Sequence, residues 1–306
     1  MKILVIGVGG IGGFIGSYLV NNNYDVTFVA REKRLSFLKT NGLKLESELG
    51  EIYSPKIKVT KEIPKEESFD IIINTVKLYD FDSVLDEIQN KIKNKPVIIP
   101  FQNGIYAEEK LKKKLPNIET IGAVAQISVF VDENQIIKHI GKLATFFVGG
   151  YDVQENKLLE DFCKNVEKTG LKIIFKKNIK EKIWEKFIFL SAYSGMTTFF
   201  LKPIGQIFED EVLKKKFIDA MLETYNLSKK FGVSFKSDPV EFWLEKIKNM
   251  PFNMTSSMHV DFNNNKKLEL DWLSGSIVTL SKKYNIKCPT HREIVEGIKK
   301  KLNNFS

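Results

Sequence analysis

The sequence predicts a two-domain chain in which residues 1–176 form an α/β domain around a parallel sheet and residues 177–306 form a mainly α-helical domain. Short β-branched runs alternate with amphipathic helical stretches in the first part, which is the pattern of parallel βαβ units. Beyond about Lys177 the strand signals almost vanish and long amphipathic stretches follow. A length of 306 residues is enough for two domains of ordinary size, each with its own core.

The strands of the first part are expected to be covered by helices on both faces. Runs such as residues 71–73 and 97–99 are continuously apolar, as in a buried parallel sheet. The predicted strands are residues 2–6, 25–30, 70–76, 96–101 and 119–124, with helices near residues 12–22, 81–93 and 107–115. After Val124, residues 126–131, 135–139 and 144–148 are predicted as antiparallel additions, joined by turns at residues 132–134 and 141–142. Residues 158–168 and 171–175 supply one more helix and strand.

The second part contains five predicted helical stretches, at residues 179–200, 211–231, 238–248, 267–284 and 290–303. We find no internal repeat and no low-complexity linker, so a short boundary near residues 175–178 and closely packed domains are expected. A cleft between two such domains is the expected place for a site.

Composition argues against several classes of protein. Hydrophobic residues make up 43% and charged residues 28%, the balance of a globular chain rather than a disordered one. The formal net charge of +9 is spread over scattered basic runs mixed with acids, which favours solvated helix faces over a nucleic-acid partner. Cys163 and Cys288 lie far apart and the three histidines are isolated, so no disulfide framework and no metal site are expected. A reducing, cytoplasmic compartment fits this composition.

Residues 7–12, with the sequence GVGGIG, match the pattern G-x-G-x-x-G. The match follows an apolar run, opens a helical stretch and precedes a second strand, which is the setting of a Rossmann-type dinucleotide-binding domain. The glycine content also argues against a signal peptide or a membrane span in the uncharged segment 3–20. The first glycine permits the tight turn, the second lets the backbone approach a pyrophosphate, and the third lets helix pack on strand. The residues expected to bind the dinucleotide here are Gly7, Gly9, Gly10, Ile11 and Gly12.

Arg31 stands after the second predicted strand, where an acid would bind a free ribose 2′-hydroxyl. Its planar guanidinium suits a 2′-phosphate, so NADPH is favoured over NADH. Glu32 is the alternative, because it fills the acidic role if the turn shifts by one residue, whereas Arg34 is expected to be solvated. Lys77 and Asn103 follow two other strands, at the carboxyl edge where such sheets bind ligands. Lys77 suits an anionic group, and Asn103 can donate and accept hydrogen bonds near a nicotinamide.

Lys186 lies in the predicted helix 179–200 with strongly apolar neighbours. Partial desolvation suits a proton donor to a ketone oxygen, although lysines on such helices commonly extend to solvent. Downstream, S-S-M-x-x-D at residues 256–261 precedes E-x-D at residues 269–271. Together with the glycine turn, V-K at 76–77, Q-N-G at 102–104 and W-x-K at 184–186, these motifs resemble those of the ketopantoate reductase (2-dehydropantoate 2-reductase) family. The resemblance runs from Met1 to about Pro289.

The resemblance implies hydride transfer from NADPH to the keto carbon of a 2-keto acid, with ketopantoate to pantoate as the favoured reaction. Lys186 matches the family's general acid, and Glu269 matches the acid that contacts the substrate hydroxyl and organises the site. Ser257 matches a ligand of the substrate carboxylate. Asn103 matches the residue that bridges cofactor and substrate, and Lys77 and Arg31 match cofactor contacts. Asp261 is expected to organise hydrogen bonds rather than to catalyse.

Two positions depart from the family's pattern. Where the best-studied members carry asparagines one and two helical turns after the lysine, this chain has Leu190 and Ser194. Leu190 cannot form a hydrogen bond, Ser194 replaces an amide only in part, and Gly195 is expected to leave space beside it. A D-2-hydroxy-acid dehydrogenase that acts on another, more apolar 2-keto acid is therefore one alternative. A non-enzymatic NADP-binding sensor is another, which the retained Lys186 and Glu269 disfavour.

The expected partner is thus a small 2-keto acid, with no nucleic acid and no membrane. The sequence leaves the oligomeric state open, a homodimer included.

Overall fold

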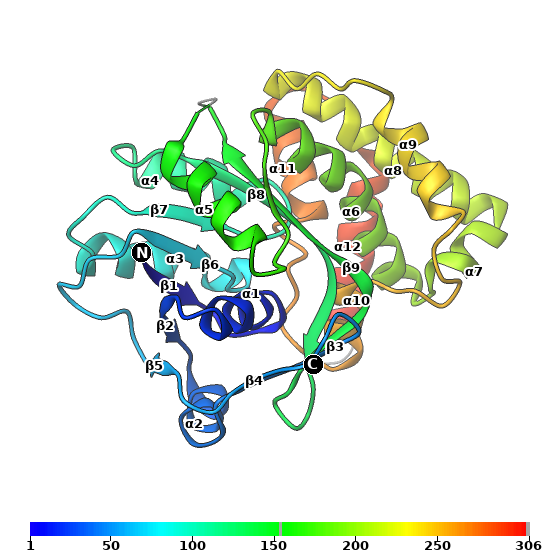
Figure 1. Cartoon of the computed structure of the whole chain (residues 1–306). Helices are drawn as coiled ribbons and strands as arrows, with labels where there is room; N and C mark the ends of the chain where they lie inside the picture. The colour runs from blue at the N-terminus through cyan, green and yellow to red at the C-terminus, as the bar shows by residue number, and fades with distance from the viewer. Residues whose placement is uncertain (153–154, 304–306) are drawn as a thin grey trace. The chain divides into compact units, whose positions relative to one another are not determined.

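The computed structural model describes residues 1–152 and 155–303 and divides the chain into two compact units (Figure 1). Unit 1 consists of Met1–Gln102 and Ala107–Ile179, and unit 2 of Asn103–Tyr106 and the chain from Lys180 onward. The chain therefore belongs to unit 2 for one short segment in the middle of unit 1. Among the described residues, no helix has both the length and the apolarity that a membrane span requires.

Unit 1 is built on a parallel five-stranded sheet with the strand order β5-β2-β1-β6-β7 (Figure 1). Nearly every residue of β1, β6 and β7 is buried, so both faces of the sheet are covered, as the apolar runs predict. This confirms the Rossmann-type α/β domain. The sheet and its helices comprise β1 (Lys2–Ile6), α1 (Gly10–Asn21), β2 (Asp25–Val29), α2 (Glu32–Asn41), β5 (Lys58–Thr60), β6 (Ile71–Asn74), α3 (Leu78–Lys91), β7 (Val97–Pro100) and α4 (Tyr106–Lys114).

A second sheet of unit 1 has the order β10-β9-β3-β4, with β8 paired to β9. β8 and β9 are antiparallel, as predicted, but each is longer than predicted. Residues 119–124 are not a fifth parallel strand, because β8 runs unbroken into the hairpin. The predicted turn at residues 141–142 is also wrong, since Gly141 lies inside β9 with φ +77°. The elements are β3 (Leu43–Ser47), β4 (Ile52–Ser54), β8 (Ile121–Val131), β9 (Ile137–Gly150), α5 (Lys157–Glu167) and β10 (Ile173–Phe175).

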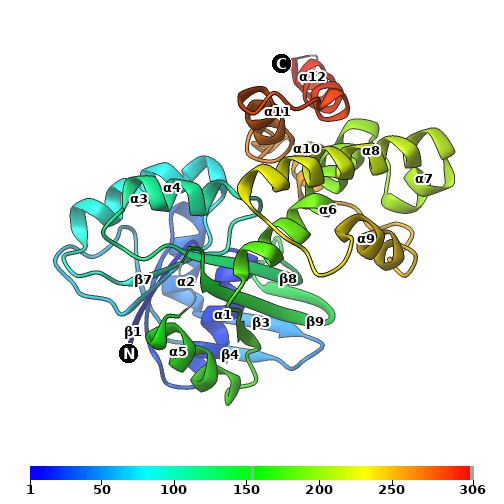
Figure 2. The ribbon, with the colours of Figure 1, turned by 90° about the horizontal axis from the view of Figure 1, so that it is seen from above.

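Unit 2 is helical, as predicted (Figure 2). Its first helix, α6, is buried around most of its circumference from Ile183 to Thr198. The stretch 267–284 is helical only from Ser274, because residues 270–273 form a turn that the Gly275 amide closes by donating to the Leu270 carbonyl oxygen at 2.9 Å. Leu268, Leu270 and Leu273 are buried. The helices are α6 (Ile179–Phe200), α7 (Ile204–Glu209), α8 (Glu211–Ser228), the 3-10 turn η1 (Lys229–Phe231), α9 (Pro239–Ile247), α10 (Ser257–Asn263), α11 (Ser274–Lys283) and α12 (Pro289–Asn303).

Candidate active site

The turn between β1 and α1 fits a dinucleotide. Gly7 has φ +90°, a conformation that favours glycine, and Thr75 Oγ1 donates a hydrogen bond of 2.6 Å to its carbonyl oxygen. A Cβ atom on Gly12 would stand 2.1 Å from that oxygen, so only glycine lets α1 pack on the turn. A Cβ atom on Gly9, by contrast, would meet no described atom within 4 Å. The open side of the turn and the first amides of α1 therefore suit a pyrophosphate.

The side chain of Arg34 forms hydrogen bonds to this turn and is largely buried, contrary to the expectation that it is solvated. Its Nε donates to the Val8 carbonyl oxygen at 2.8 Å, and its Nη1 donates to the Gln135 carbonyl oxygen at 2.5 Å. Burial lowers the pKa of Arg34 to about 10, although the carboxylate of Asp132 acts in the opposite direction. The hairpin also touches the turn directly, since a Cβ atom on Gly10 would stand 2.6 Å from a hairpin carbonyl oxygen. The guanidinium thus joins the glycine turn to the β8–β9 hairpin.

Arg31 lies beside the glycine turn, because the Gly7 amide donates to the Val29 carbonyl oxygen at the end of β2. Its side chain is 51% exposed, and its Nη2 lies 3.4 Å from Glu87 Oε1 of α3. Glu32 is also exposed and has φ +47°, an uncommon conformation for a residue with a side chain. The arginine and the alternative acid therefore stand side by side at the end of β2.

The ends of β6 and β7 are joined by Gln102, a residue to which the sequence assigned no role. Its buried Nε2 donates to the carbonyl oxygens of Asn74 and Val76 at 3.2 and 2.9 Å. Lys77, half-buried, immediately follows and precedes the first turn of α3. Its place directly after the predicted strand 96–101, in the Q-N-G motif at residues 102–104, was the signal that could have identified Gln102.

In unit 2, Lys186 and Asn103 are in direct contact. Lys186 Nζ of α6 donates a hydrogen bond of 2.8 Å to Asn103 Oδ1. A Cβ atom on Gly104 would lie 3.5 Å from both Phe187 Cε2 and the Trp272 carbonyl oxygen. The segment 103–106 therefore packs against α6 and against the turn that precedes α11.

Glu269 lies in that turn rather than in a helix. Its side chain is buried, and its carbonyl oxygen accepts hydrogen bonds of 3.1 Å from the amides of Trp272 and Leu273. Because Gly104 touches the same turn, the Lys186–Asn103 pair and the turn that carries Glu269 meet on one segment.

Ser194 and Leu190 follow Lys186 at intervals of four residues, so the three side chains lie along one side of α6. Ser194 is buried and Leu190 is half-buried. Gly195 does not leave space, contrary to expectation, because a Cβ atom there would lie 2.8 Å from Ser274 Oγ. Ser257 is exposed at the first position of α10.

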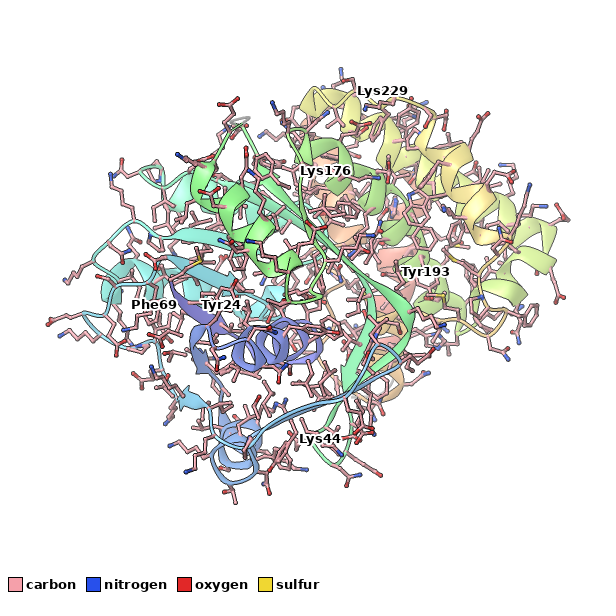
Figure 3. The ribbon with its side chains drawn as sticks, viewed as in Figure 1. Tyr24, Lys44, Phe69, Lys176, Tyr193 and Lys229 are labelled. Carbon is pink, nitrogen blue, oxygen red and sulfur yellow. The ribbon has the colours of Figure 1, made fainter. Side chains whose placement is uncertain are left out.

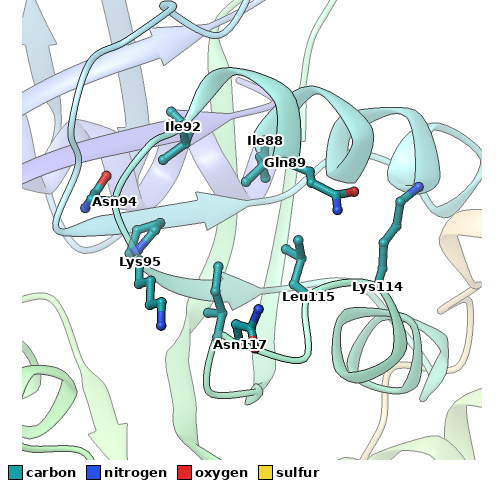
Figure 4. Close-up of a pocket in the computed structure, with 10 residues that line it drawn as sticks. Ile88, Gln89, Ile92, Asn94, Lys95, Lys114, Leu115 and Asn117 are labelled. Atoms are coloured by element: carbon teal, nitrogen blue, oxygen red, sulfur yellow. The ribbon is translucent and has the colours of Figure 1, made fainter.

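A cavity of about 210 Å³ lies in unit 1, and none of the predicted site residues lines it (Figure 4). Ile88 of α3, Ile92 directly after that helix, Leu115 after α4, and Lys95 contribute to its walls. Lys95 precedes β7, so the cavity lies at the opposite end of that strand from Gln102. Within residues 1–152 and 155–303, no cluster of three or more His, Cys, Asp or Glu side chains could hold a metal ion.

Comparisons with known proteins agree with this architecture. Residues 3–152 match the family model "Ketopantoate reductase PanE/ApbA", and residues 178–302 match "Ketopantoate reductase PanE/ApbA C terminal". The uncharacterized oxidoreductase YkpB of Bacillus subtilis is 29% identical over 94% of this chain and 95% of its own length. The 2-dehydropantoate 2-reductase of Pyrococcus horikoshii is 26% identical over 94% of this chain and 93% of its own.

Two solved structures show the same fold. The 2-dehydropantoate 2-reductase of Methylococcus capsulatus has a TM-score of 0.88 at 22% identity and covers 100% of this chain and 98% of its own. D-mandelate dehydrogenase, solved with NADH and anilino(oxo)acetate, has a TM-score of 0.88 at 19% identity, with 99% of both chains covered. With both of its halves matched by the family models, this chain belongs to the ketopantoate reductase family and is an oxidoreductase with a nicotinamide cofactor.

Proposed function

We propose that this protein reduces a 2-keto acid with NADPH, and that ketopantoate, reduced to pantoate, is its substrate. The observation that carries the proposal is the 2.8 Å hydrogen bond from Lys186 Nζ to Asn103 Oδ1. It joins the residue that the family resemblance assigns to proton donation to the one assigned to the bridge between cofactor and substrate.

The cofactor is assigned to residues that follow the carboxyl ends of the unit 1 strands. The backbone of residues 7–12 would hold the pyrophosphate, and Arg31 would hold the 2′-phosphate. Lys77 would supply a further positive charge to the cofactor, and Asn103 an amide. The bound nicotinamide would supply the hydride that the ketone carbon receives.

Asn103 has a defined orientation in this scheme. An ammonium group can only donate hydrogen bonds, so the amide oxygen of Asn103 must face Lys186. The Nδ2 group then points away from Lys186 and can donate to an oxygen of a ligand. The same bond holds the ammonium of Lys186 in place.

Lys186 would act on the ketone oxygen. Negative charge develops there as the carbon is reduced, so a positioned ammonium both stabilises the charge and transfers a proton to it. The buried carboxylate of Glu269 would accept a hydrogen bond from the substrate hydroxyl, and Ser257 would donate to the substrate carboxylate. In this proposal Ser194 makes a further polar contact with the substrate.

A D-2-hydroxy-acid dehydrogenase is the second candidate, and Leu190 favours it. This side chain is half-buried on the same side of α6 as Lys186, where it offers apolar contact and no hydrogen bond. A substrate with an apolar side chain would suit that position better than one with a hydroxyl. Membership of a family of oxidoreductases argues against the non-enzymatic sensor.

A turnover assay separates the candidates. The purified protein is mixed with NADPH or NADH and with ketopantoate, 2-ketoisovalerate or phenylglyoxylate, and loss of the reduced cofactor is followed by absorbance. The proposal requires the highest kcat/KM for ketopantoate with NADPH. A higher kcat/KM for phenylglyoxylate would favour the second candidate, and no turnover with any of the three acids would contradict both.

A further inference from the structure

A chain of buried hydroxyl groups joins α10 to α6 within unit 2. The His259 amide donates to Ser256 Oγ at 3.1 Å, Ser256 Oγ lies 2.7 Å from Thr197 Oγ1, and Thr197 Oγ1 donates to the Tyr193 carbonyl oxygen at 2.7 Å. Thr197 is fully buried and Ser256 is 2% exposed. Figure 3 labels Tyr193, which stacks on the Phe189 ring of the same helix at a centroid distance of 5.0 Å.

The direction of each hydrogen bond follows from the chemistry of its ends. The Tyr193 carbonyl can only accept, so the hydroxyl hydrogen of Thr197 points toward it. Thr197 therefore accepts from Ser256, which in turn accepts from the His259 amide. Each hydroxyl donates once and accepts once, which leaves neither of them with an unmet hydrogen bond in the core. Such a chain holds the start of α10 against α6 in one arrangement.

This chain lies between two residues proposed to bind the substrate. Ser257 directly follows Ser256, and Ser194 lies three residues before Thr197, one turn away on α6. We propose that Thr197 and Ser256 are positioning residues whose hydrogen bond fixes Ser257 relative to Ser194 and so determines the affinity for the 2-keto acid. The inference rests on the proposed function of Ser257 and Ser194.

Thr198 supplies a matched control. It is the next residue of α6 and is fully buried, yet its Oγ1 has no hydrogen-bond partner among the residues that the structure describes. Thr198→Val therefore makes the same replacement of a hydroxyl by a methyl group in the same helix without interrupting the chain of hydrogen bonds. Thr197→Val interrupts it, and Thr197→Ser keeps the hydroxyl while removing only a methyl group.

The experiment compares these three variants with Ser256→Ala and Ser257→Ala. Thr197→Val and Ser256→Ala should each raise KM for ketopantoate by about five- to tenfold, the effect expected for one lost hydrogen bond. Their kcat and their affinity for NADPH should stay close to those of the wild type. Thr197→Ser, which keeps the hydroxyl, and Thr198→Val should both have the KM of the wild type. Amide exchange at His259 should become faster in Thr197→Val but not in Thr198→Val.

The outcomes separate this inference from the proposed function. If Ser257→Ala raises KM while Thr197→Val does not, the positioning role is overturned and Ser257 keeps its own. If Ser257→Ala leaves KM unchanged, the role of Ser257 fails and the inference fails with it. Equal losses of kcat and melting temperature in Thr197→Val and Thr198→Val would also overturn positioning, because they would indicate core packing alone.

Discussion

His291 of α12 is buried without any exposed surface, and its ionisation can be predicted. Its Nε2 lies 3.0 Å from the Ala220 carbonyl oxygen and 3.0 Å from Thr224 Oγ1. Burial lowers the pKa of His291 from 6.5 to about 4, although the hydrogen bond to the Ala220 carbonyl opposes this. A carbonyl can only accept, so Nε2 carries the proton of a neutral imidazole at pH 7. The carboxylate of the neighbouring Glu223 accepts a hydrogen bond from the backbone amide of His291.

The consequence is a loss of stability in acid. The unfolded chain protonates His291 below about pH 6.5, whereas the folded chain resists protonation down to about pH 4. The unfolded state therefore gains protons first, and the free energy of unfolding falls as pH decreases through this window. With about 1.4 kcal/mol per pKa unit, the loss is about 2 kcal/mol at pH 5 and about 3 kcal/mol at pH 4.

Glu223 acts in the opposite direction and must be separated from His291. Burial raises the pKa of its carboxyl, so the folded state favours the protonated form and gains stability as pH falls. His291→Gln removes the titrating ring but keeps both the backbone amide that Glu223 binds and a side-chain donor. The difference between wild type and variant therefore isolates the imidazole.

Urea unfolding at pH 7 and pH 5 measures this difference. All three tryptophans, Trp184, Trp243 and Trp272, belong to unit 2, so their fluorescence reports the unfolding of that unit. Between pH 7 and pH 5 the wild type should lose about 2 kcal/mol more stability than His291→Gln. The chain has only three histidines, so NMR can follow the His291 ring directly. A ring that titrates near pH 6.5 in the folded protein, or an equal loss in both proteins, would refute the reasoning.

Three further predictions concern catalysis and the cofactor. Lys186→Ala should lower kcat by about 100-fold or more and leave the dissociation constant for NADPH unchanged, as expected for a general acid; unaltered turnover would remove Lys186 from the mechanism. Arg31→Ala should raise the dissociation constant for NADPH by about tenfold, since a hydrogen bond to a charged group is lost. The dissociation constant for NADH should rise less. If calorimetry shows that the affinities for NADPH and NADH fall equally, Arg31 does not bind the 2′-phosphate. Glu87→Gln removes the ion pair with Arg31 and should lower the dissociation constant for NADPH by about two- to threefold. A change of this size corresponds to the free energy of an exposed ion pair. Asp86→Asn, which removes an acid of the same helix that pairs with Lys114, is the control and should have no effect.

Local patterns in the sequence were sufficient for the parallel sheet, the glycine turn and the long helix α6. The hydrophobic period identifies a buried strand or an amphipathic helix from a few consecutive residues, and G-x-G-x-x-G needs only the strand before it and the helix after it. The same patterns found no element between residues 32 and 60. β4 and β5 span only three residues each. β3 pairs with the distant β9 and β5 with β2, and β4 is held only by its pairing with β3.

The sequence by itself determined the family, the class of fold and the residues that match the family's motifs. Only the tertiary structure showed what holds those residues in place. Arg34 bonds to Gln135, which is 101 residues away, and Thr197 bonds to Ser256, which is 59 residues away. Hydrogen bonds over such separations depend on which surfaces pack together, and no periodicity or spacing in the sequence records that. Lys186 could therefore be identified from its motif, but only the folded structure shows its contact with Asn103.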